Sequence, residues 1–165
     1  MIDSTHLYRH NTVSHIGQPF PARTLYFNNK FFIMIQHTIS RISIWMLAVV
    51  MIIFGIYHFV RPENMLAYVP NYLPGGIIWV YIVGAAFILA GLAFIFNRFV
   101  AVAGYVLAVL LISFVLMIHL PQYKNAGDED MRQLSMVNLL KDLALAGFAM
   151  FIAANSKHQH LNTID

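Results

Sequence analysis

Four long runs of apolar residues dominate the chain, and polar or charged positions bound each of them. The runs cover residues 42–60, 77–96, 99–120 and 136–154. A helix of about 20 apolar residues crosses the hydrocarbon core of a bilayer, so each run predicts one transmembrane helix. The connections between runs are long, tight and long, which favours antiparallel neighbours. We therefore expect an all-α membrane protein with an antiparallel four-helix transmembrane bundle of up-down topology.

The segments around these runs divide the chain into three parts. Residues 1–33 are polar and mixed with no sustained period, so we expect a disordered N-terminal extension there. Met34 offers an alternative start of the chain. Residues 34–156 form the predicted transmembrane domain, and residues 157–165 form a short polar tail.

The connection after the first run is unusually apolar for a loop. Pro62 suits the first position of a helix, Glu63 complements the positive helix end, and Pro70 stops a helix. We expect a short interfacial helix over residues 62–69 that covers the bundle as a lid. Between the second and third runs, Asn97 and Arg98 predict a tight turn.

The overall composition agrees with a membrane protein, since 59% of the residues are hydrophobic and only 10% are charged. The net charge of +3 does not indicate a nucleic-acid protein, because the basic residues are scattered at the ends of apolar runs. Their distribution instead predicts orientation by the positive-inside rule. One side of the bundle carries Lys30, Arg41, Arg98 and Lys157, and the other carries Arg61, Lys124 and Arg132. This count places both termini in the cytoplasm.

The fourth run contains two charges, Lys141 and Asp142, one turn after Asn138. Ions inside a membrane span are costly, and these three polar residues share one side of a helix, so that side must face protein or water. The up-down topology brings polar residues of the other helices to the same half of the bundle. These are His58, Arg61, Glu63, His119 and Gln122. We take Lys141, Asp142, Asn138, His119, His58 and Arg61 as candidate ligand-binding residues in the outer-leaflet half.

The residues that are missing exclude several chemistries. The chain has no cysteine, which removes thiol redox chemistry, disulfides and iron–sulfur ligation. The histidines lack metal-ligand spacing within the apolar runs, and no glycine-rich nucleotide loop is present, so we expect neither a metal nor a nucleotide. The expected partners are the lipid bilayer and either another membrane redox protein or a second copy of the chain.

Several short motifs together resemble the DoxX-like membrane proteins. The resemblance covers residues 42–154, and the fourth-helix lysine followed by a polar residue and a small-residue run is its most telling feature. The motifs run from Gly55 to Pro62, from Tyr72 to Gly76, through the Asn97–Arg98 turn, and from Lys141 to Gly147. The resemblance implies a four-helix protein of the bacterial inner membrane, linked to quinol oxidation and to membrane redox or oxidative-stress complexes.

Two classes of function remain open at this point. In the first, the protein is a redox-associated subunit that binds a quinone, with Lys141 and a histidine contacting the carbonyl groups and Asp142 moving the proton. In the second, it is a scaffold or assembly subunit, and the Lys141–Asp142 pair only specifies packing. The sequence lacks the residues that would form a complete electron-transfer path, so a subunit is favoured over a stand-alone enzyme. Transport would call for broken helices and an inverted repeat, which the sequence lacks.

Overall fold

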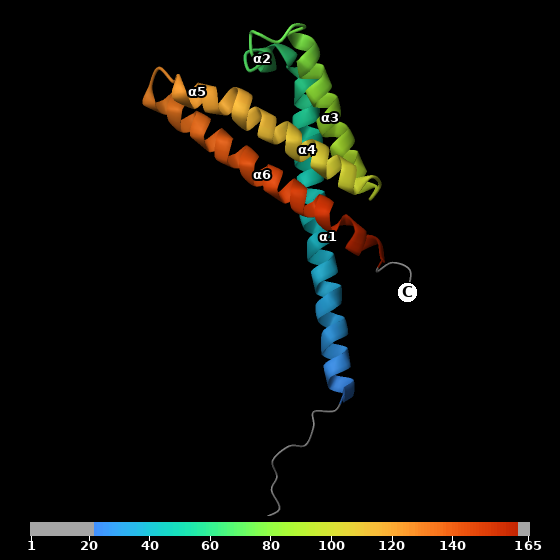
Figure 1. Cartoon of the computed structure of the whole chain (residues 1–165). Coiled ribbons are helices and arrows are strands. Elements are labelled where there is room, and N and C mark those ends of the chain that lie inside the picture. The colour runs from blue at the N-terminus through green and yellow to red at the C-terminus, as the bar shows by residue number, and fades with distance from the viewer. Residues whose placement is uncertain (1–21, 162–165) are drawn as a thin grey trace, which may run out of the picture. The chain divides into compact units, whose positions relative to one another are not determined.

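The structure, a computed structural model, describes the backbone of residues 22–161 and the side chains of residues 31–156. Within this part of the chain every regular element is a helix (Figure 1). The elements are α1 (Ala22–Val60), α2 (Pro62–Leu66), α3 (Ile77–Ile95), α4 (Val100–Phe114), the π-helical turn η1 (Val115–His119), α5 (Leu120–Lys124) and α6 (Glu129–Leu161). Four helical stretches are long and apolar enough to cross a membrane: 31–60, 77–95, 100–124 and 129–156. The chain is therefore an all-α, four-helix, multi-pass membrane protein, as the hydrophobic pattern predicts.

Helix α1 begins much earlier than the hydrophobic pattern indicates. It starts at Ala22, directly after Pro21, whereas the apolar run starts at Ile42. Residues 22–33 are thus helical and the expectation of disorder is wrong for them, while residues 1–21 lie outside the described part. The reason is that neither glycine nor proline occurs between Ala22 and Phe54, so nothing breaks the helix. The chain divides into two units, residues 1–39 and Ser40–Asp165, and the four-helix packing and the cavity belong to the second.

Glycines bring α1 and α3 together along their length. A side chain added at Gly55 would lie 2.6 Å from the backbone oxygen of Gly84, and one at Gly91 would lie 2.8 Å from the backbone oxygen of Ala48. Such positions allow only glycine unless the helices separate. These glycines are therefore packing positions between the two helices.

The turn between α3 and α4 is built on Asn97, whose φ is +52°. The backbone N–H of Arg98 donates to the oxygen of Ala93 at 3.0 Å, and that of Asn97 donates to the oxygen of Phe94 at 3.3 Å. This is the Schellman pattern, and asparagine is one of the few residues besides glycine that tolerate the left-handed position. The tight turn predicted at Asn97 and Arg98 is confirmed. From it α3 and α4 diverge, α3 toward α2 and α4 toward α5 (Figure 1).

The third and fourth spans both extend beyond the predicted runs. The third continues through the π turn to Lys124 instead of ending at residue 120, and the fourth begins at Glu129 instead of residue 136. Asp128 starts α6 early, because its carboxylate accepts the backbone N–H of Met131 at 2.7 Å. The connection between the predicted third and fourth runs, residues 121–135, is consequently shortened to residues 125–128.

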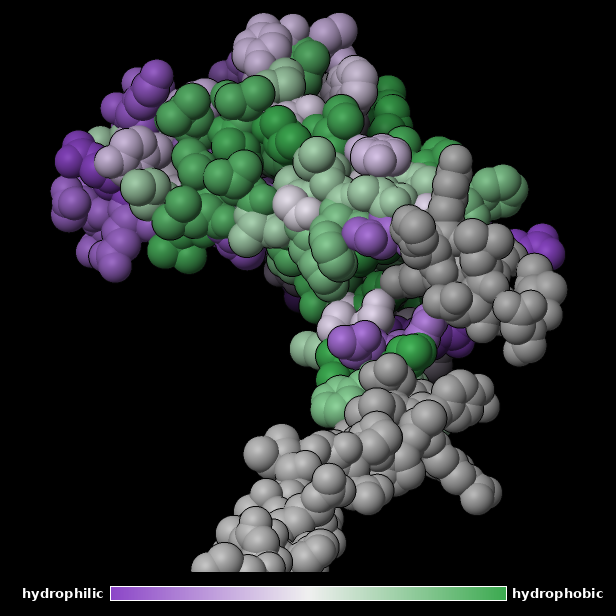
Figure 2. Space-filling view, turned by 60° about the horizontal axis from the view of Figure 1, so that its bottom comes forward, coloured by the Kyte–Doolittle hydropathy of each residue, from purple (hydrophilic) through white to green (hydrophobic). Residues whose placement is uncertain are grey.

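Helices α4 and α6 lie antiparallel and side by side (Figure 1). A side chain added at Gly104 would lie 2.7 Å from the backbone oxygen of Ala149, so these backbones also approach closely. The core between the helices is filled by buried apolar side chains, among them Met51, Phe87 and Leu107. The outer surface is largely apolar as well, with hydrophilic side chains gathered at the connection between α5 and α6 on the left of Figure 2.

Candidate functional site

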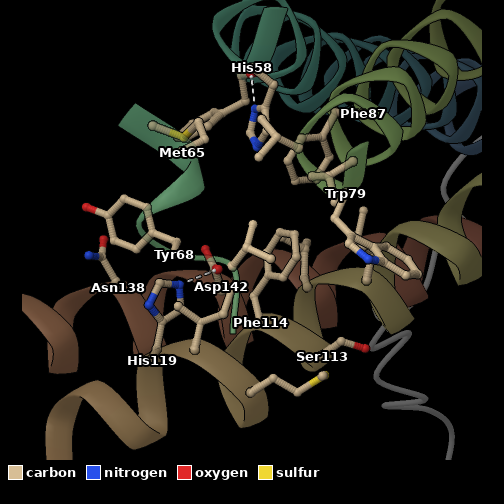
Figure 3. Close-up of a pocket in the computed structure, with 18 of the residues that line it drawn as sticks. His58, Met65, Tyr68, Trp79, Phe87, Ser113, Phe114, His119, Asn138 and Asp142 are labelled. Atoms are coloured by element: carbon tan, nitrogen blue, oxygen red, sulfur yellow. Dashed lines mark hydrogen bonds and ion pairs between the residues drawn. The ribbon is translucent and has the colours of Figure 1, made fainter. Parts of the chain in front are cut away.

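A cavity of about 490 Å³ lies between the helices, in a volume range typical of small-molecule sites. Side chains from α1, α3, α4, η1 and α6, together with the segment that joins α1 to α3, form its walls (Figure 3). The polar or ionisable side chains in the lining include His58, Ser113, His119, Asn138, Lys141 and Asp142. The remaining lining is mostly aliphatic, aromatic or methionine side chains. The cavity is therefore suited to an apolar body that carries a small polar group.

Aromatic rings form a continuous wall around Phe87 of α3. The Phe87 ring meets the rings of Phe54, His58 and Phe114 edge to face, with centroids 6.5, 5.6 and 6.0 Å away. Edge-to-face contacts of this kind hold rings in fixed orientations. The shape of this wall is therefore set before any ligand enters.

The polar cluster of the cavity joins η1 to α6. The imidazole Nε2 of His119 lies 3.1 Å from Oδ2 of Asp142, and Nζ of Lys141 lies 3.6 Å from Oδ1 of the same carboxylate. Lys141 also donates to Oδ1 of Asn138 at 3.2 Å. Asp142 is only 5% exposed, whereas the Lys141 side chain is 42% exposed. One carboxylate thus holds a histidine and a lysine together, and the lysine keeps access to its surroundings.

Lys141 also connects α6 to α1. Its ammonium lies 5.4 Å from the centroid of the Phe54 ring, a cation–π distance. His58, one turn after Phe54, also lines the cavity, and its Nδ1 lies 2.7 Å from the backbone oxygen of Phe54. The structure therefore brings five of the six candidate residues to one cavity. These are His58, His119, Asn138, Lys141 and Asp142.

Arg61 is the candidate that the structure does not bring to the site. It is exposed and does not line the cavity, and neither do Glu63 and Gln122. The chain leaves helical geometry at Arg61, where φ is −133° and ψ is +57°, so its side chain no longer follows the α1 face that carries His58. Arg61 stays an anchor at the end of the span.

The connection between α1 and α3 closes one side of the cavity. The predicted helix over residues 62–69 is shorter in the structure, where α2 ends at Leu66 and turns follow. Met65, Tyr68 and Val69 nevertheless line the cavity, so this segment covers it as expected. Trp79 at the start of α3 fixes the segment, because its indole N–H donates to the backbone oxygen of Pro74 at 2.8 Å.

Two features of the site escaped the sequence analysis. The first is the aromatic wall. Its Phe residues are as apolar as those that face lipid or fill a core, so hydrophobicity alone does not distinguish them. The second is the π turn that carries His119. Proline at position 121 was its only signal, because proline has no N–H for the helix ladder and its ring needs space in the preceding turn.

The chemistry available in the cavity is binding and proton exchange. Among the side chains of residues 31–156, no group of three or more His, Asp or Glu residues is arranged to hold a metal ion. Lys141 can donate hydrogen bonds, Asp142 can accept them, and His119 adjoins the carboxylate. An apolar molecule with a polar head would find its hydrogen-bonding partners at this one edge.

Comparisons with known proteins give one match. No curated protein and no solved structure matches the chain. A family model with the description "Domain of unknown function (DUF8561)" matches residues 47–153, which is more than half of the chain and includes every residue that lines the cavity. The chain therefore belongs to the DUF8561 family.

Proposed function

We propose that this protein binds a lipophilic molecule of the quinone or quinol class in the cavity and serves as a redox-associated membrane subunit. The observation that carries the proposal is the polar cluster of Lys141, Asp142 and His119 at one edge of an otherwise apolar, aromatic-walled cavity. A quinone has the matching form, with a flat ring, polar oxygens at the ring and an apolar tail. Its ring would lie against Phe87 and Phe114, and its tail among the aliphatic side chains.

The polar cluster would handle the head group. Lys141 would donate a hydrogen bond to a ring oxygen, and Asp142, held by His119, would exchange a proton with it. The chain has no cysteine that could carry electrons, and we assign it no other electron carrier. A partner protein in the membrane would therefore supply or receive the electrons, which makes this chain a subunit rather than a complete enzyme.

We further propose that the protein lies in the bacterial inner membrane with both termini in the cytoplasm. The DoxX-like motifs support a bacterial inner-membrane protein, and the positive-inside count supports cytoplasmic termini and a cytoplasmic Asn97–Arg98 turn. In that orientation the polar cluster lies in the outer-leaflet half of the bundle.

Fluorescence of Trp79 tests the binding directly. The chain has two tryptophans: Trp79 lines the cavity, and Trp45 is exposed on α1 outside its lining. In the Trp45→Phe variant, decylubiquinone added to the detergent-solubilised protein should quench Trp79 saturably. The Lys141→Met substitution in this background should weaken the binding roughly tenfold, because a hydrogen bond to a charged group is lost.

The matched control is Trp79→Phe, in which only Trp45 reports. Its quenching should rise linearly with quinone, as expected for partition into the micelle. Equal, linear quenching of both single-tryptophan variants would contradict the proposal. It would favour the scaffold function, which has its own support: Lys141 and Asp142 lie within ion-pair distance and neutralise each other.

A further inference from the structure

The hydrogen bond of His58 defines which ring nitrogen carries the proton. Nδ1 of His58 lies 2.7 Å from the backbone oxygen of Phe54. A carbonyl oxygen only accepts, so Nδ1 must be the donor. In a neutral imidazole the other nitrogen, Nε2, is then a hydrogen-bond acceptor. His58 thus contributes a defined acceptor to the cavity that it lines.

The ring is also held in place. It meets the Phe87 ring edge to face at 5.6 Å, and Figure 3 shows it reaching from α1 toward the cavity with its bonded nitrogen turned back to the helix. Gly84 of α3 makes this possible, because a side chain there would lie 2.7 Å from Cβ of His58. A fixed ring presents its acceptor in one direction.

The carboxylate of the cavity does not engage His58. His58 is 9% exposed, and within residues 31–156 no carboxylate lies within ion-pair distance of it. The carboxylate of the cavity, Asp142, already serves His119 and Lys141. Nε2 of His58 is therefore left for a ligand.

We propose that His58 is a specificity-determining residue whose Nε2 selects a ligand that carries a phenolic hydroxyl. The hydroxyl would donate to Nε2, while Lys141, whose ammonium lies 5.4 Å from the centroid of the Phe54 ring, would donate to a second oxygen of the same head group. An aromatic head without a hydroxyl would leave Nε2 unpaired. For a quinone-class ligand, the reduced form would be the one that binds tighter. This inference rests on the proposed function of the cavity.

Two ligands that differ in one group test the selection without redox chemistry. These are para-hexylphenol and para-hexyltoluene, in which a methyl group takes the place of the hydroxyl. Calorimetric titration of the detergent-solubilised protein measures both affinities in the parent and in the His58→Phe variant. The affinity for the phenol is divided by that for the toluene in each protein, and the two quotients are compared. Partition of the ligands into the micelle cancels in this comparison, since both proteins are measured in the same micelles. We expect the preference for the phenol to fall about threefold to tenfold in His58→Phe.

A second variant excludes a general effect of losing an imidazole. His37→Phe makes the same change on α1 at a ring that does not line the cavity, and it should keep the preference for the phenol. A preference that survives in His58→Phe, or that is absent from the parent although both ligands bind, overturns the role of His58 and leaves the proposed function intact. Failure of both ligands to bind the parent overturns both proposals. The comparison within the parent stands even where a variant does not fold.

Discussion

His119 and Asp142 lie 23 positions apart in the sequence, yet Nε2 of the imidazole is 3.1 Å from Oδ2 of the carboxylate. Both residues are buried, and they join the π turn to α6 in the half of the bundle where α3 and α4 have diverged. One carboxylate therefore links η1 to α6, and it also faces Lys141 on its own helix. A charge in that position needs its partners, because nothing apolar can replace the lost hydration.

Removing His119 should therefore loosen the bundle. We expect His119→Phe to lower the free energy of unfolding by about 1 to 2 kcal/mol, the value that model peptides give for interhelical hydrogen bonds in membranes. Unfolding by sodium dodecyl sulfate, followed by circular dichroism, measures the loss. A double-mutant cycle with Asp142→Leu should show that the two effects are not additive. Lys141→Met is the matched control and should cost less, because its side chain is 42% exposed and its ion-pair distance is longer, at 3.6 Å. Strictly additive effects of His119→Phe and Asp142→Leu would contradict the contact.

The glycines of the spans offer a second test, since their surroundings differ. Gly84→Ala should destabilise the protein by about 1 to 3 kcal/mol, the cost of overpacking, because the new methyl group would meet Cβ of His58 at 2.7 Å. Gly147→Ala is the control on α6, where nothing lies within 4 Å of the added carbon. It should be neutral or stabilising, since alanine favours a helix over glycine. The same unfolding assay compares the two, and equal stability of both variants would argue against close packing of α1 on α3.

The fold and the grouping of five of the six candidate residues at one cavity could be predicted from the sequence, for different reasons. The spans can be predicted from hydrophobicity, because a segment that crosses the bilayer must be a helix of about 20 mostly apolar residues. The meeting of His119 with Lys141 and Asp142 followed from topology, because the end of the third run and the start of the fourth must share one half of the bundle. Arg61 was placed in the same half of the bundle. Its depth in the membrane does not specify which way its side chain points, and the backbone leaves helical geometry there. The early start of α6 at Asp128 depends on a cap outside the apolar pattern.

The segment over the cavity should be more ordered than a free loop. Trp79→Phe removes the indole N–H that donates to Pro74, so the backbone of residues 67–76 should exchange hydrogen for deuterium faster, by roughly tenfold where one such bond limits opening. Mass spectrometry of the exchanged protein measures this by peptide. Trp45→Phe is the control and should leave the segment unchanged, because Trp45 lies outside the cavity lining. An unchanged exchange rate in Trp79→Phe would show that this hydrogen bond does not hold the segment.

The orientation in the membrane can be tested with single cysteines, since the chain has none of its own. In whole cells, a cysteine at Asn97 should resist an impermeant thiol reagent, and one at Lys124 should react. The two positions suit the experiment because Asn97 lies in the α3–α4 turn and Lys124 ends α5, at opposite ends of the third span. Arg41 and Arg98 on the Asn97 side supply the positive charge that favours the cytoplasm. Opening the cells with detergent should make Asn97→Cys reactive, which controls for local shielding. The reverse labelling would invert the protein and place the polar cluster in the inner leaflet, while the geometry that joins His119, Lys141 and Asp142 would be unaffected.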